Sequence, residues 1–536
     1  MELTIPAALE RAASLFGERT AIAEPGGARL TYRELHEQAS TIAAALVQAG
    51  IEAGDRISIW SPNTHHWVVA ALGAQTAGAT LVPVNTRFTG AEALDVLSRG
   101  GACVLFVAGP FLGADRLAAL RAADGAEPGR LGRLRLIVTV PVESADAGEG
   151  AGTGTAWPGK EVLGWTELRR RGAAAPAALA AQRRAAITPD DVSDILFTSG
   201  TTGRSKGAMS AHRQGLAVAA AWADCGQVTS DDRYLVVSPF FHSFGYKAGI
   251  LVCLLTGAAM IPQLVYDPEA AMRLIATERI TVLPGAPTVY QTILDHPARA
   301  SLDLSSLRLA VTGAAVVPVA LVERMQAELS FDTVLTAYGL TEAVVVTMCR
   351  PGDPPQTVAT TSGRATSDFE IRLAGPTGSE PGVTGEILLR GPNVMLGYLD
   401  DPVATKEAID ADGWLHTGDV GRLDADGNLT ITDRLKDMYI CGGFNVYPAE
   451  VEQVLARLDG VAESAVIGAP DARLGEVGKA FIVRQPGHEL TDVEVIAHCR
   501  DRLANFKVPR HVEFRLSLPR TPAGKALKRL LKEESL

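Results

Sequence analysis

Helix-like and strand-like patterns of apolar residues alternate through the first part of the chain. The sequence Thr31-Tyr-Arg-Glu34 has the spacing of a capping box and predicts a helix that ends near Gly50. An apolar run over residues 56–60 predicts a strand, a helical pattern follows over residues 65–77, and residues 80–84 predict the next strand. This order predicts an α/β fold in which helices cover largely parallel sheets.

The middle of the chain is less regular. Residues 143–159 are rich in Gly, Ala and acidic residues and predict a solvent-exposed loop, while the Ala-rich residues 173–186 predict one surface helix. Strand-like patterns recur over residues 192–197, 385–390 and 429–432. No internal repeat is found in the sequence.

A charged segment divides the chain into two unequal parts. Residues 433–437 are mostly charged and lie between apolar runs, so they form either an ordinary turn or a linker between two bodies that move. Residues 449–503 contain two helical patterns around one strand pattern, and about 100 residues suffice for a small domain. The 536 residues exceed the usual size of one domain, so we predict domains over residues 1–432 and 433–536.

The composition is that of a globular protein with an acidic surplus. Hydrophobic residues make up 47% and charged residues 21%, and the formal net charge is −11. This negative charge argues against general binding to nucleic acid or to anionic membranes. Residues 501–536, however, hold nine Lys and Arg against four Asp and Glu. That basic tail suggests either a surface for one polyanionic ligand or an ordinary solvated helix.

Neither membrane insertion nor a cysteine framework is expected. The most apolar window, residues 248–261, is too short to span a bilayer, and the N-terminus has no signal-peptide pattern. The six cysteines are scattered without a C-x-x-C pair, which suggests neither a zinc site nor disulfides. We expect a cytoplasmic location, and the sequence leaves a homodimer open.

The segment that follows residues 192–197 has the composition of a triphosphate site. Glycines let backbone N–H groups approach phosphates, hydroxyls donate hydrogen bonds, and Lys206 adds a point charge. The spacing is not that of a P-loop, so a nucleotide would be held on a different scaffold. By itself the segment fits a flexible surface linker equally well. Its candidate phosphate-binding residues are Thr198, Ser199, Gly200, Thr201, Thr202, Gly203 and Lys206.

Four later segments also carry residues capable of chemistry. Tyr338-Gly-Leu-Thr-Glu342 offers an aromatic face, a hydroxyl and a carboxylate, and Thr417-Gly-Asp419 offers a carboxylate at a tight turn. Asp433-Arg434 opens the charged segment, and Pro519-Arg-Thr-Pro-Ala-Gly-Lys525 places a Lys on a loop rich in Pro and Gly. Each segment is a weak signal alone. In this order, the set resembles the adenylate-forming superfamily of acyl-CoA synthetases, luciferases and peptide-synthetase adenylation domains.

The resemblance covers essentially the whole chain, from the Thr31 region to Lys525. It implies a large N-terminal domain of two packed sheets with helices plus a β-barrel, and a small, mobile α+β C-terminal lid. Lys436 lies at the position of the family's hinge. The implied enzyme is an acid–thiol ligase: a carboxylate and ATP give an acyl-adenylate and pyrophosphate, and the thiol of coenzyme A then takes the acyl group.

The resemblance also implies a role for individual residues of the nucleotide site. Thr341 would contact the phosphate and Glu342 would ligate Mg²⁺. Asp419 and Arg434 would bind the ribose hydroxyls, and Lys525 would reach the acyl-phosphate junction. The adenine would be framed by Gly313, Ala314, Ala315, Tyr338 and Gly339.

Further implied roles concern the acid and coenzyme A. His242 would stand as a mobile gate at the mouth of the acid pocket, although a histidine in such a segment also serves core packing. Gly442 and Gly443 would let the backbone approach the pantetheine arm after a rotation of the lid. The family often has Pro where this chain has Ser205 and Asn where it has Thr521. Neither change removes a charge or a metal ligand.

The segments that would flank the acid pocket are mostly apolar or small, with Tyr246, Thr288 and Tyr290 as candidate polar handles. This lining suits a bulky, mostly apolar acid with a few oxygens. Residues 61–64, 240–249 and 433–452 resemble one actinobacterial branch of the family. That branch activates the bicyclic propanoate left after opening of the steroid A and B rings (a methyl-dioxo-octahydroindenyl propanoate, HIP).

Other functions fit the sequence as well. The acid could be a medium-chain fatty or aryl acid, and the acceptor could be a carrier protein in place of coenzyme A. No carrier domain or long hinge insertion is recognised, which favours coenzyme A. A different class is a nucleotide-binding regulator without catalysis. The presence of both Glu342 and Lys525 argues against that class.

Overall fold

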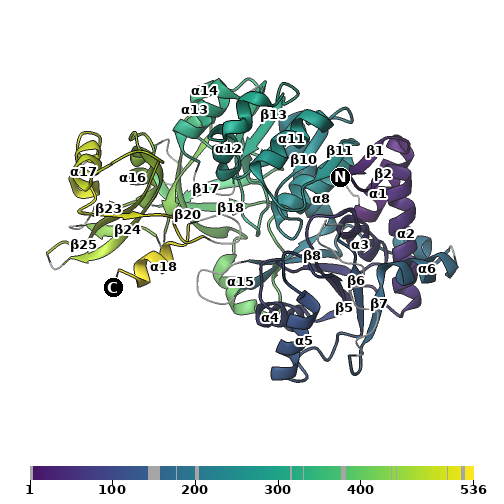
Figure 1. Ribbon diagram of the computed structural model, residues 1–536. Coiled ribbons are helices and arrows are strands. Elements are labelled where there is room, and N and C mark those ends of the chain that lie inside the picture. Colours follow the sequence, from purple (N-terminus) through teal and green to yellow (C-terminus); the bar gives the residue numbers. More distant parts are fainter. Residues whose placement is uncertain are drawn as a thin grey trace.

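The fold consists of two large mixed sheets, a four-stranded antiparallel sheet and a C-terminal sheet, with helices packed around them (Figure 1). The computed structural model describes residues 4–142, 157–176, 178–198, 205–313, 317–329, 331–375, 382–435, 437–441, 444–471, 473–503, 505–520 and 526–535. The helices before residue 410 are α1 (Ile5–Phe16), α2 (Tyr32–Gln48), α3 (His65–Thr76), α4 (Gly90–Gly100), α5 (Arg116–Ala126), α6 (Trp165–Ala174), α7 (Ala178–Ala185), α8 (His212–Gly226), α9 (Ser243–Gly245), α10 (Val252–Thr256), α11 (Pro268–Glu278), α12 (Pro287–Leu294), α13 (Val319–Glu328), α14 (Pro355–Thr360) and α15 (Pro402–Ala408).

One large sheet carries the candidate phosphate loop. Its strands are β3 (Arg56–Trp60), β4 (Thr80–Pro83), β5 (Ala102–Ala108), β6 (Leu136–Val140), β7 (Glu161–Gly164), β8 (Val192–Thr198), β9 (Lys206–Ala211) and β19 (Gly397–Tyr398). They lie in the order β19-β9-β8-β4-β3-β5-β6-β7. The strands from β8 to β7 are parallel, whereas β9 is antiparallel to both β8 and β19. The loop after β8 therefore connects two neighbouring strands.

Loops at one edge of the second large sheet carry residues that the sequence predicts to bind adenine and Mg²⁺. Its strands are β1 (Thr20–Ala23), β2 (Arg29–Thr31), β10 (Arg233–Val236), β11 (Ala259–Pro262), β12 (Val282–Gly285), β13 (Leu309–Thr312), β14 (Thr333–Tyr338), β15 (Thr347–Met348) and β16 (Arg364–Ala365). Strands β11, β10, β12, β13 and β14 are parallel neighbours. Gly313 and Gly339 directly follow β13 and β14, so both lie at the edge where ligands bind to open parallel sheets.

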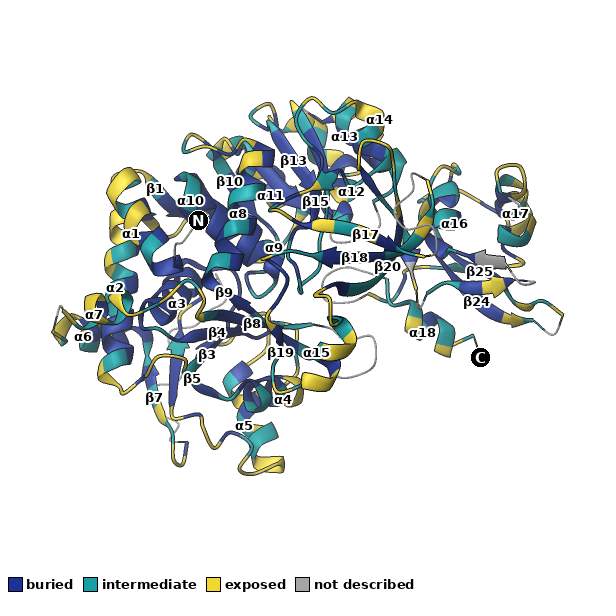
Figure 2. Ribbon diagram, turned by 180° about the vertical axis from the view of Figure 1, so that it is seen from behind, coloured by how far each residue is buried: buried dark blue, intermediate teal, exposed yellow. Residues whose placement is uncertain are grey.

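Helix α3 is enclosed in the core. All of its residues are buried, and Figure 2 shows the helix in the buried colour along its length. A helix that meets apolar neighbours on every side lacks an amphipathic face, which is why its sequence has no polar stripe. The main apolar cluster joins α2, α3 and α8 to strands of both large sheets. The two sheets thus share one core.

Two smaller sheets follow along the chain. The first consists of β17 (Glu370–Ala374), β18 (Thr384–Arg390), β20 (Leu415–Leu423) and β21 (Leu429–Arg434), all antiparallel. The C-terminal sheet consists of β22 (Tyr439–Cys441), β23 (Phe444–Val446), β24 (Val461–Asp471), β25 (Gly475–Arg484) and β26 (His511–Arg515), with helices α16 (Pro448–Leu455), α17 (Asp492–Arg500) and α18 (Lys528–Glu533). In Figure 1, β17, β18 and β20 lie between the C-terminal sheet and the rest of the protein.

Local patterns predicted several of the elements that the structure describes. The capping box is confirmed, since Thr31 accepts the Glu34 N–H and Glu34 accepts the Thr31 N–H, and β3 covers the predicted residues. The single helix predicted over residues 173–186 is wrong. The backbone becomes extended at Ala175, because Pro176 disfavours the helical conformation of the residue before it. Part of the predicted loop, residues 143–156, lies outside the described residues.

Two further expectations concern the membrane and the thiols. Among the helices in the described part of the chain, none combines the length and the apolar character that crossing a bilayer requires. All six cysteines are buried as free thiols, in agreement with the prediction of no disulfide framework.

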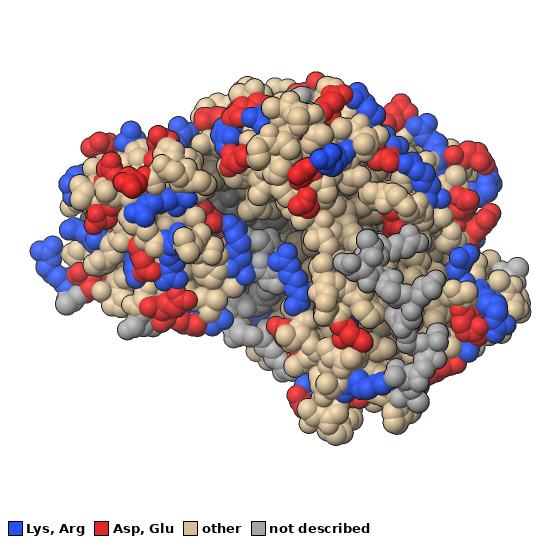
Figure 3. All heavy atoms as spheres, in the orientation of Figure 1, with Lys and Arg blue, Asp and Glu red and all other residues tan. Residues whose placement is uncertain are grey.

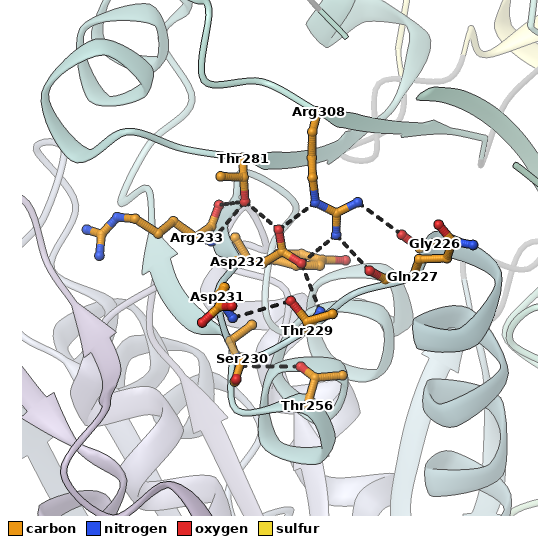
Figure 4. Close-up of polar contacts among 12 residues, drawn as sticks. Gly226, Gln227, Thr229, Ser230, Asp231, Asp232, Arg233, Thr256, Thr281 and Arg308 are labelled. Carbon is orange, nitrogen blue, oxygen red and sulfur yellow. Dashed lines mark hydrogen bonds and ion pairs between the residues drawn. The ribbon is translucent and has the colours of Figure 1, made fainter. Parts of the chain in front are cut away.

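A polar brace ties together the starts of three parallel strands (Figure 4). Asp232, Thr281 and Arg308 are the residues directly before β10, β12 and β13. Arg308 donates to both carboxylate oxygens of Asp232, with the Nε–Oδ1 distance at 2.7 Å, and Thr281 Oγ1 donates to Oδ1 at 2.7 Å. The Thr229 N–H donates to Oδ2 at 2.8 Å, and Arg308 Nη2 also donates to the Gln227 carbonyl. The brace therefore fixes the sheet at the edge opposite the candidate site.

We expect Asp232→Asn to lower the free energy of unfolding at pH 7 by about 2–3 kcal/mol, since Arg308 then keeps a charge without its partner. Burial raises the pKa of Asp232, but the bonds from Arg308, Thr229 and Thr281 outweigh it and hold that pKa below its usual value. The stabilisation is therefore present above a pH of about 4 and is lost as the pH falls through the folded-state pKa. Urea denaturation from pH 7 down to pH 3 checks this, because the difference between wild type and variant should shrink at low pH.

The neighbouring Asp231 provides the control. Its side chain is 87% exposed and pairs with Arg19 at the surface, so Asp231→Asn should change the free energy of unfolding by less than about 1 kcal/mol. If the difference in the free energy of unfolding between wild type and Asp232→Asn stayed constant with pH, it would contradict the stabilising role of the Asp232–Arg308 pair.

Candidate functional site

The two ends of the candidate phosphate loop are held together as a hairpin. Thr198 pairs with Lys206 across β8 and β9, and its Oγ1 donates to the Lys206 carbonyl at 3.4 Å. From α4, Arg99 donates to the Ser205 carbonyl at 2.6 Å, and its guanidinium lies 5.2 Å from the centroid of the Phe197 ring. A cavity of about 320 Å³ opens beside these residues. The structure thus anchors both flanks of the loop.

Several predicted site residues lie outside the described residues, and their roles stay predictions. They are Ser199, Gly200, Thr201, Thr202, Gly203, Ala314, Ala315, Lys436, Gly442, Gly443 and Lys525. The remaining predicted residues are described and fall into three groups.

The first group joins Lys206, at the end of the candidate phosphate loop, to Glu342, the predicted Mg²⁺ ligand. Glu342 follows β14 and is half-buried, as is Thr341 beside it. The hydroxyl of Tyr398 donates to Glu342 Oε1 at 2.8 Å, and Lys206 Nζ lies 5.1 Å from the centroid of the Tyr398 ring. Burial, and then the charge of Glu342, raises the pKa of the Tyr398 phenol well above its usual value, so the hydroxyl remains a donor. No motif in the sequence predicted Tyr398, which lies in the two-residue strand β19.

The carboxylate of Glu342 is suited to coordinate Mg²⁺. Its second carboxylate oxygen has no hydrogen bond to any residue that the structure describes, so it is available to a cation. In the described part of the chain no group of three or more His, Cys, Asp or Glu side chains could hold a metal ion. One carboxylate therefore suits a Mg²⁺ ion that enters with the phosphates of a nucleotide, which is how Mg²⁺ is usually bound.

The second group consists of the described residues that are predicted to bind adenine and ribose. The Tyr338 hydroxyl, at the end of β14, donates to Asp419 Oδ2 at 2.6 Å, and Asp419 in β20 pairs with the backbone of Arg434 in β21. Residues as far apart in the sequence as 338 and 434 thus meet at one place. A Cβ atom on Gly339 would lie 1.8 Å from the Val344 carbonyl, and one on Gly313 would lie 2.4 Å from the Ala337 carbonyl. Only glycine fits at these two positions.

The third group lies around His242. This residue caps the short helix α9, and its Nδ1 accepts the Phe244 N–H at 3.2 Å, so its ring has a defined orientation. A π-helix over Tyr246–Leu251 follows, a conformation that is rare and frequent at functional sites. The mobility predicted for His242 is not tested by this geometry.

Two of the proposed polar handles for the acid are wrong. Both tyrosines are fully buried. The hydroxyl of Tyr246 accepts from Gln75 Nε2 at 2.6 Å, and that of Tyr290 donates to the carbonyls of Leu283 and Val311 at 2.6 and 3.0 Å. Sequence alone could not show this, because the partners lie on other helices and strands. Thr288 is half-buried and remains a candidate.

A buried ion pair connects the π-helix to the strand of the phosphate loop. Lys247 Nζ lies 2.9 Å from Asp194 Oδ1 in β8, and both side chains are 0% exposed. Ser193 Oγ donates to Asp194 Oδ2 at 2.7 Å. The sequence held a signal for this pair, since each residue is the only charged one in an apolar segment. The pair links the elements on which the acid and phosphate candidates lie.

The C-terminal part contacts the remainder of the protein near the adenine loop. Helix α16 extends Gln453 toward the segment before α13, where its Nε2 donates to the Val317 carbonyl at 3.0 Å and its Oε1 accepts the Val319 N–H at 3.1 Å. Asp433 Oδ2, at the end of β21, accepts the Ala449 N–H at 2.9 Å. Figure 3 shows Lys and Arg side chains along the walls of the hollow between the two parts.

Most of the basic tail is paired within the C-terminal part. Lys528 Nζ lies 2.8 Å from Glu452, and although burial lowers its pKa, Glu452 and other nearby carboxylates outweigh burial and raise that pKa above its usual value. Carboxylates also pair with Lys507, Arg515, Arg520 and Arg529. The excess positive charge in the sequence is therefore largely neutralised locally.

Two family models match the chain. Residues 9–399 match the AMP-binding enzyme family, and residues 450–525 match the AMP-binding enzyme C-terminal domain.

Curated relatives match over nearly the full length. A methyl-dioxo-octahydroindenyl propanoyl:CoA ligase of Rhodococcus jostii (strain RHA1) is 59% identical over 531 residues, which are 99% of this chain and 98% of the relative. The ligase of the same description from Mycobacterium tuberculosis is 60% identical over 532 residues, again 99% and 98% of the two chains. A feruloyl-CoA synthase of Amycolatopsis is 38% identical over 94% of this chain and 93% of its own.

Solved structures share the fold. ATP-bound MatB from Rhodopseudomonas palustris superimposes with a TM-score of 0.84 at 29% identity and covers 99% of both chains. The anthranilate CoA ligase AuaEII, in complex with anthranoyl-AMP, has a TM-score of 0.86 at 26% identity and covers 100% of this chain and 97% of its own.

Proposed function

The chain belongs to the AMP-binding enzyme family, and we propose that it is an AMP-forming acid–CoA ligase whose acid is the bicyclic propanoate HIP. The observation that carries this proposal is the identity of 59–60%, over 99% of the chain, to two ligases of that description. The described residues support the reaction type, because Tyr398 brings Glu342 together with Lys206, and Tyr338, four positions before Glu342, is bonded to Asp419.

In the first step, the carboxylate of the acid attacks the α-phosphorus of ATP, the bond to the β-phosphate breaks, and the products are the acyl-adenylate and pyrophosphate. A carboxylate is ionised at neutral pH and needs no general base, so the residues position the reactants and offset negative charge. The loop donors and Lys206 hold the β- and γ-phosphates, Tyr338 and Asp419 hold the nucleoside, and Lys525 stabilises charge at the acyl-phosphate junction. Mg²⁺ on Glu342 supplies further charge neutralisation when bound.

In the second step, the thiol of coenzyme A attacks the acyl-adenylate and AMP leaves. We propose that the C-terminal part, which follows β21, is a lid that turns about Lys436. The turn withdraws Lys525 and brings Gly442 and Gly443 to the pantetheine arm. Asp433 and Arg434 are strand residues of β21, which favours a turning point in the short connection before β22. The four-stranded sheet β17-β18-β20-β21 is our candidate for the family's barrel, and a cytoplasmic homodimer stays a prediction.

The acid determines which ligase this is, so a panel of acids tests the proposal. We expect pyrophosphate release with HIP to exceed that with octanoate, benzoate or ferulate by at least about tenfold in kcat/KM, because a pocket shaped for a bicyclic acid loses contacts with a smaller or flat one. Each acid is assayed with and without coenzyme A, and the thioester is identified by mass spectrometry.

Each outcome separates the alternatives. Preference for another acid would replace HIP but keep the ligase, and adenylate formation without transfer to coenzyme A would indicate a carrier-protein loader. Absence of pyrophosphate release with every acid, together with ATP binding, would indicate a regulator without catalysis.

A further inference from the structure

Tyr398 contacts two residues of the nucleotide site that are far apart in the sequence. Its hydroxyl donates to Glu342 Oε1 at 2.8 Å, and its ring lies under Lys206, with Nζ 5.1 Å from the ring centroid. Glu342 follows a strand of the second large sheet, whereas Lys206 begins β9 of the first. One aromatic side chain thus spans the junction between the metal candidate and the phosphate loop.

The backbone holds Tyr398 firmly in this place. Strand β19 pairs with β9, and Leu399 N–H donates to the Gly207 carbonyl at 2.8 Å. On the other side, Met395 N–H donates to the carbonyl of Glu342 at 2.7 Å. The Tyr398 N–H donates to Thr405 Oγ1 in α15 at 2.9 Å. The segment that presents the ring is therefore bonded both to the loop's exit strand and to Glu342 itself.

We propose that Tyr398 is a positioning residue for the metal-bound nucleotide, which fixes the carboxylate of Glu342 through its hydroxyl and the ammonium of Lys206 through its ring. This inference rests on the proposed function, because Glu342 and Lys206 act on Mg²⁺ and phosphate only if ATP binds here. It extends that function to a residue outside the motifs that defined the site.

The two contacts act on different parts of ATP binding. With Oε1 occupied by the hydroxyl, Glu342 is held in one rotamer and presents Oε2 to the cation, and loss of such a supporting hydrogen bond costs about 10- to 100-fold in metal affinity. The ring restricts Lys206 by a cation–π contact worth about 0.5–1 kcal/mol at a partly exposed site. A phenylalanine keeps the second contact and loses the first, whereas a leucine loses both.

ATP binding by the full-length protein, measured by calorimetry without any acid so that no reaction follows, separates these effects. We expect Tyr398→Phe to raise the Mg²⁺ concentration for half-maximal ATP binding about tenfold or more, and to leave ATP binding in EDTA within about twofold of the wild type. Tyr398→Leu should show the same change and should also weaken ATP binding in EDTA about two- to fivefold.

Tyr266→Phe is the matched control. It removes a hydroxyl that donates to the Val289 carbonyl at 2.9 Å on α12, away from Glu342, and should leave the Mg²⁺ dependence unchanged. A Tyr398→Phe variant with the Mg²⁺ dependence of the wild type would overturn the inference, as would equal ATP binding by both Tyr398 variants in EDTA. A wild-type protein that binds no ATP would overturn the proposed function instead.

Discussion

The Lys525→Gln variant is expected to release pyrophosphate from ATP and HIP about 10²- to 10³-fold more slowly than the wild type. Removing one donor that faces charge developing in a transition state costs about that much in kcat. The KM for ATP should change little, because in the proposed mechanism the nucleotide is also bound in the ground state by other residues, among them the bonded pair Tyr338 and Asp419. Single-turnover pyrophosphate release without coenzyme A measures the first step alone.

The same variant also tests the lid. If Lys525 acts only in the first step, thioester formation from synthetic acyl-adenylate and coenzyme A should stay within about threefold of the wild-type rate. Lys532→Gln on α18 is the matched control, since it removes the same charge from the same tail and should leave pyrophosphate release unchanged. An equal loss in both steps would contradict the two-conformation scheme, and near-normal adenylation would contradict the role of Lys525.

Short-range signals made much of the fold predictable. The capping box at Thr31, the strand Arg56–Trp60 and the strand before the phosphate loop depend on periodicity and on spacings of a few residues, and the structure has them where the pattern placed them. The predicted helix over residues 173–186 failed for a local reason as well, since Pro176 interrupts it. The expected boundary in the charged segment is close to the end of β21, where the chain leaves one sheet for another.

Side-chain partners between distant elements could not be predicted. Tyr246 and Tyr290 have polar tips that resemble ligand handles in the sequence, yet buried partners from other elements occupy both hydroxyls. Conversely, nothing near Tyr398 in the sequence announces a contact with Glu342, which lies 56 positions away. Motif order predicted a nucleotide site, but only the pairing of β9 with β19 showed that Tyr398 lies beside two of its candidate residues.

The buried pair of Lys247 and Asp194 leads to the largest expected effect on stability. Lys247→Met should lower the free energy of unfolding by about 3–5 kcal/mol, because it leaves the carboxylate of Asp194 in the core without its partner. The double variant Lys247→Met/Asp194→Asn should recover at least half of that loss, since no uncompensated charge remains and the Asn oxygen can still accept from Ser193 Oγ at the present 2.7 Å. Urea denaturation followed by tryptophan fluorescence provides the free energies.

A surface pair shows what the buried location contributes. Arg273 and Glu269 on α11 are 64% and 42% exposed, so Arg273→Met should cost less than about 0.5 kcal/mol. If Lys247→Met were equally mild, the pair would not support the core. A double variant as unstable as Lys247→Met alone would mean that the unpaired carboxylate of Asp194 is not the cause of the loss. Recovery in the double variant would instead establish that the charges on the π-helix and on β8 require each other, so that this pair couples the segment after His242 to the strand before the candidate phosphate loop.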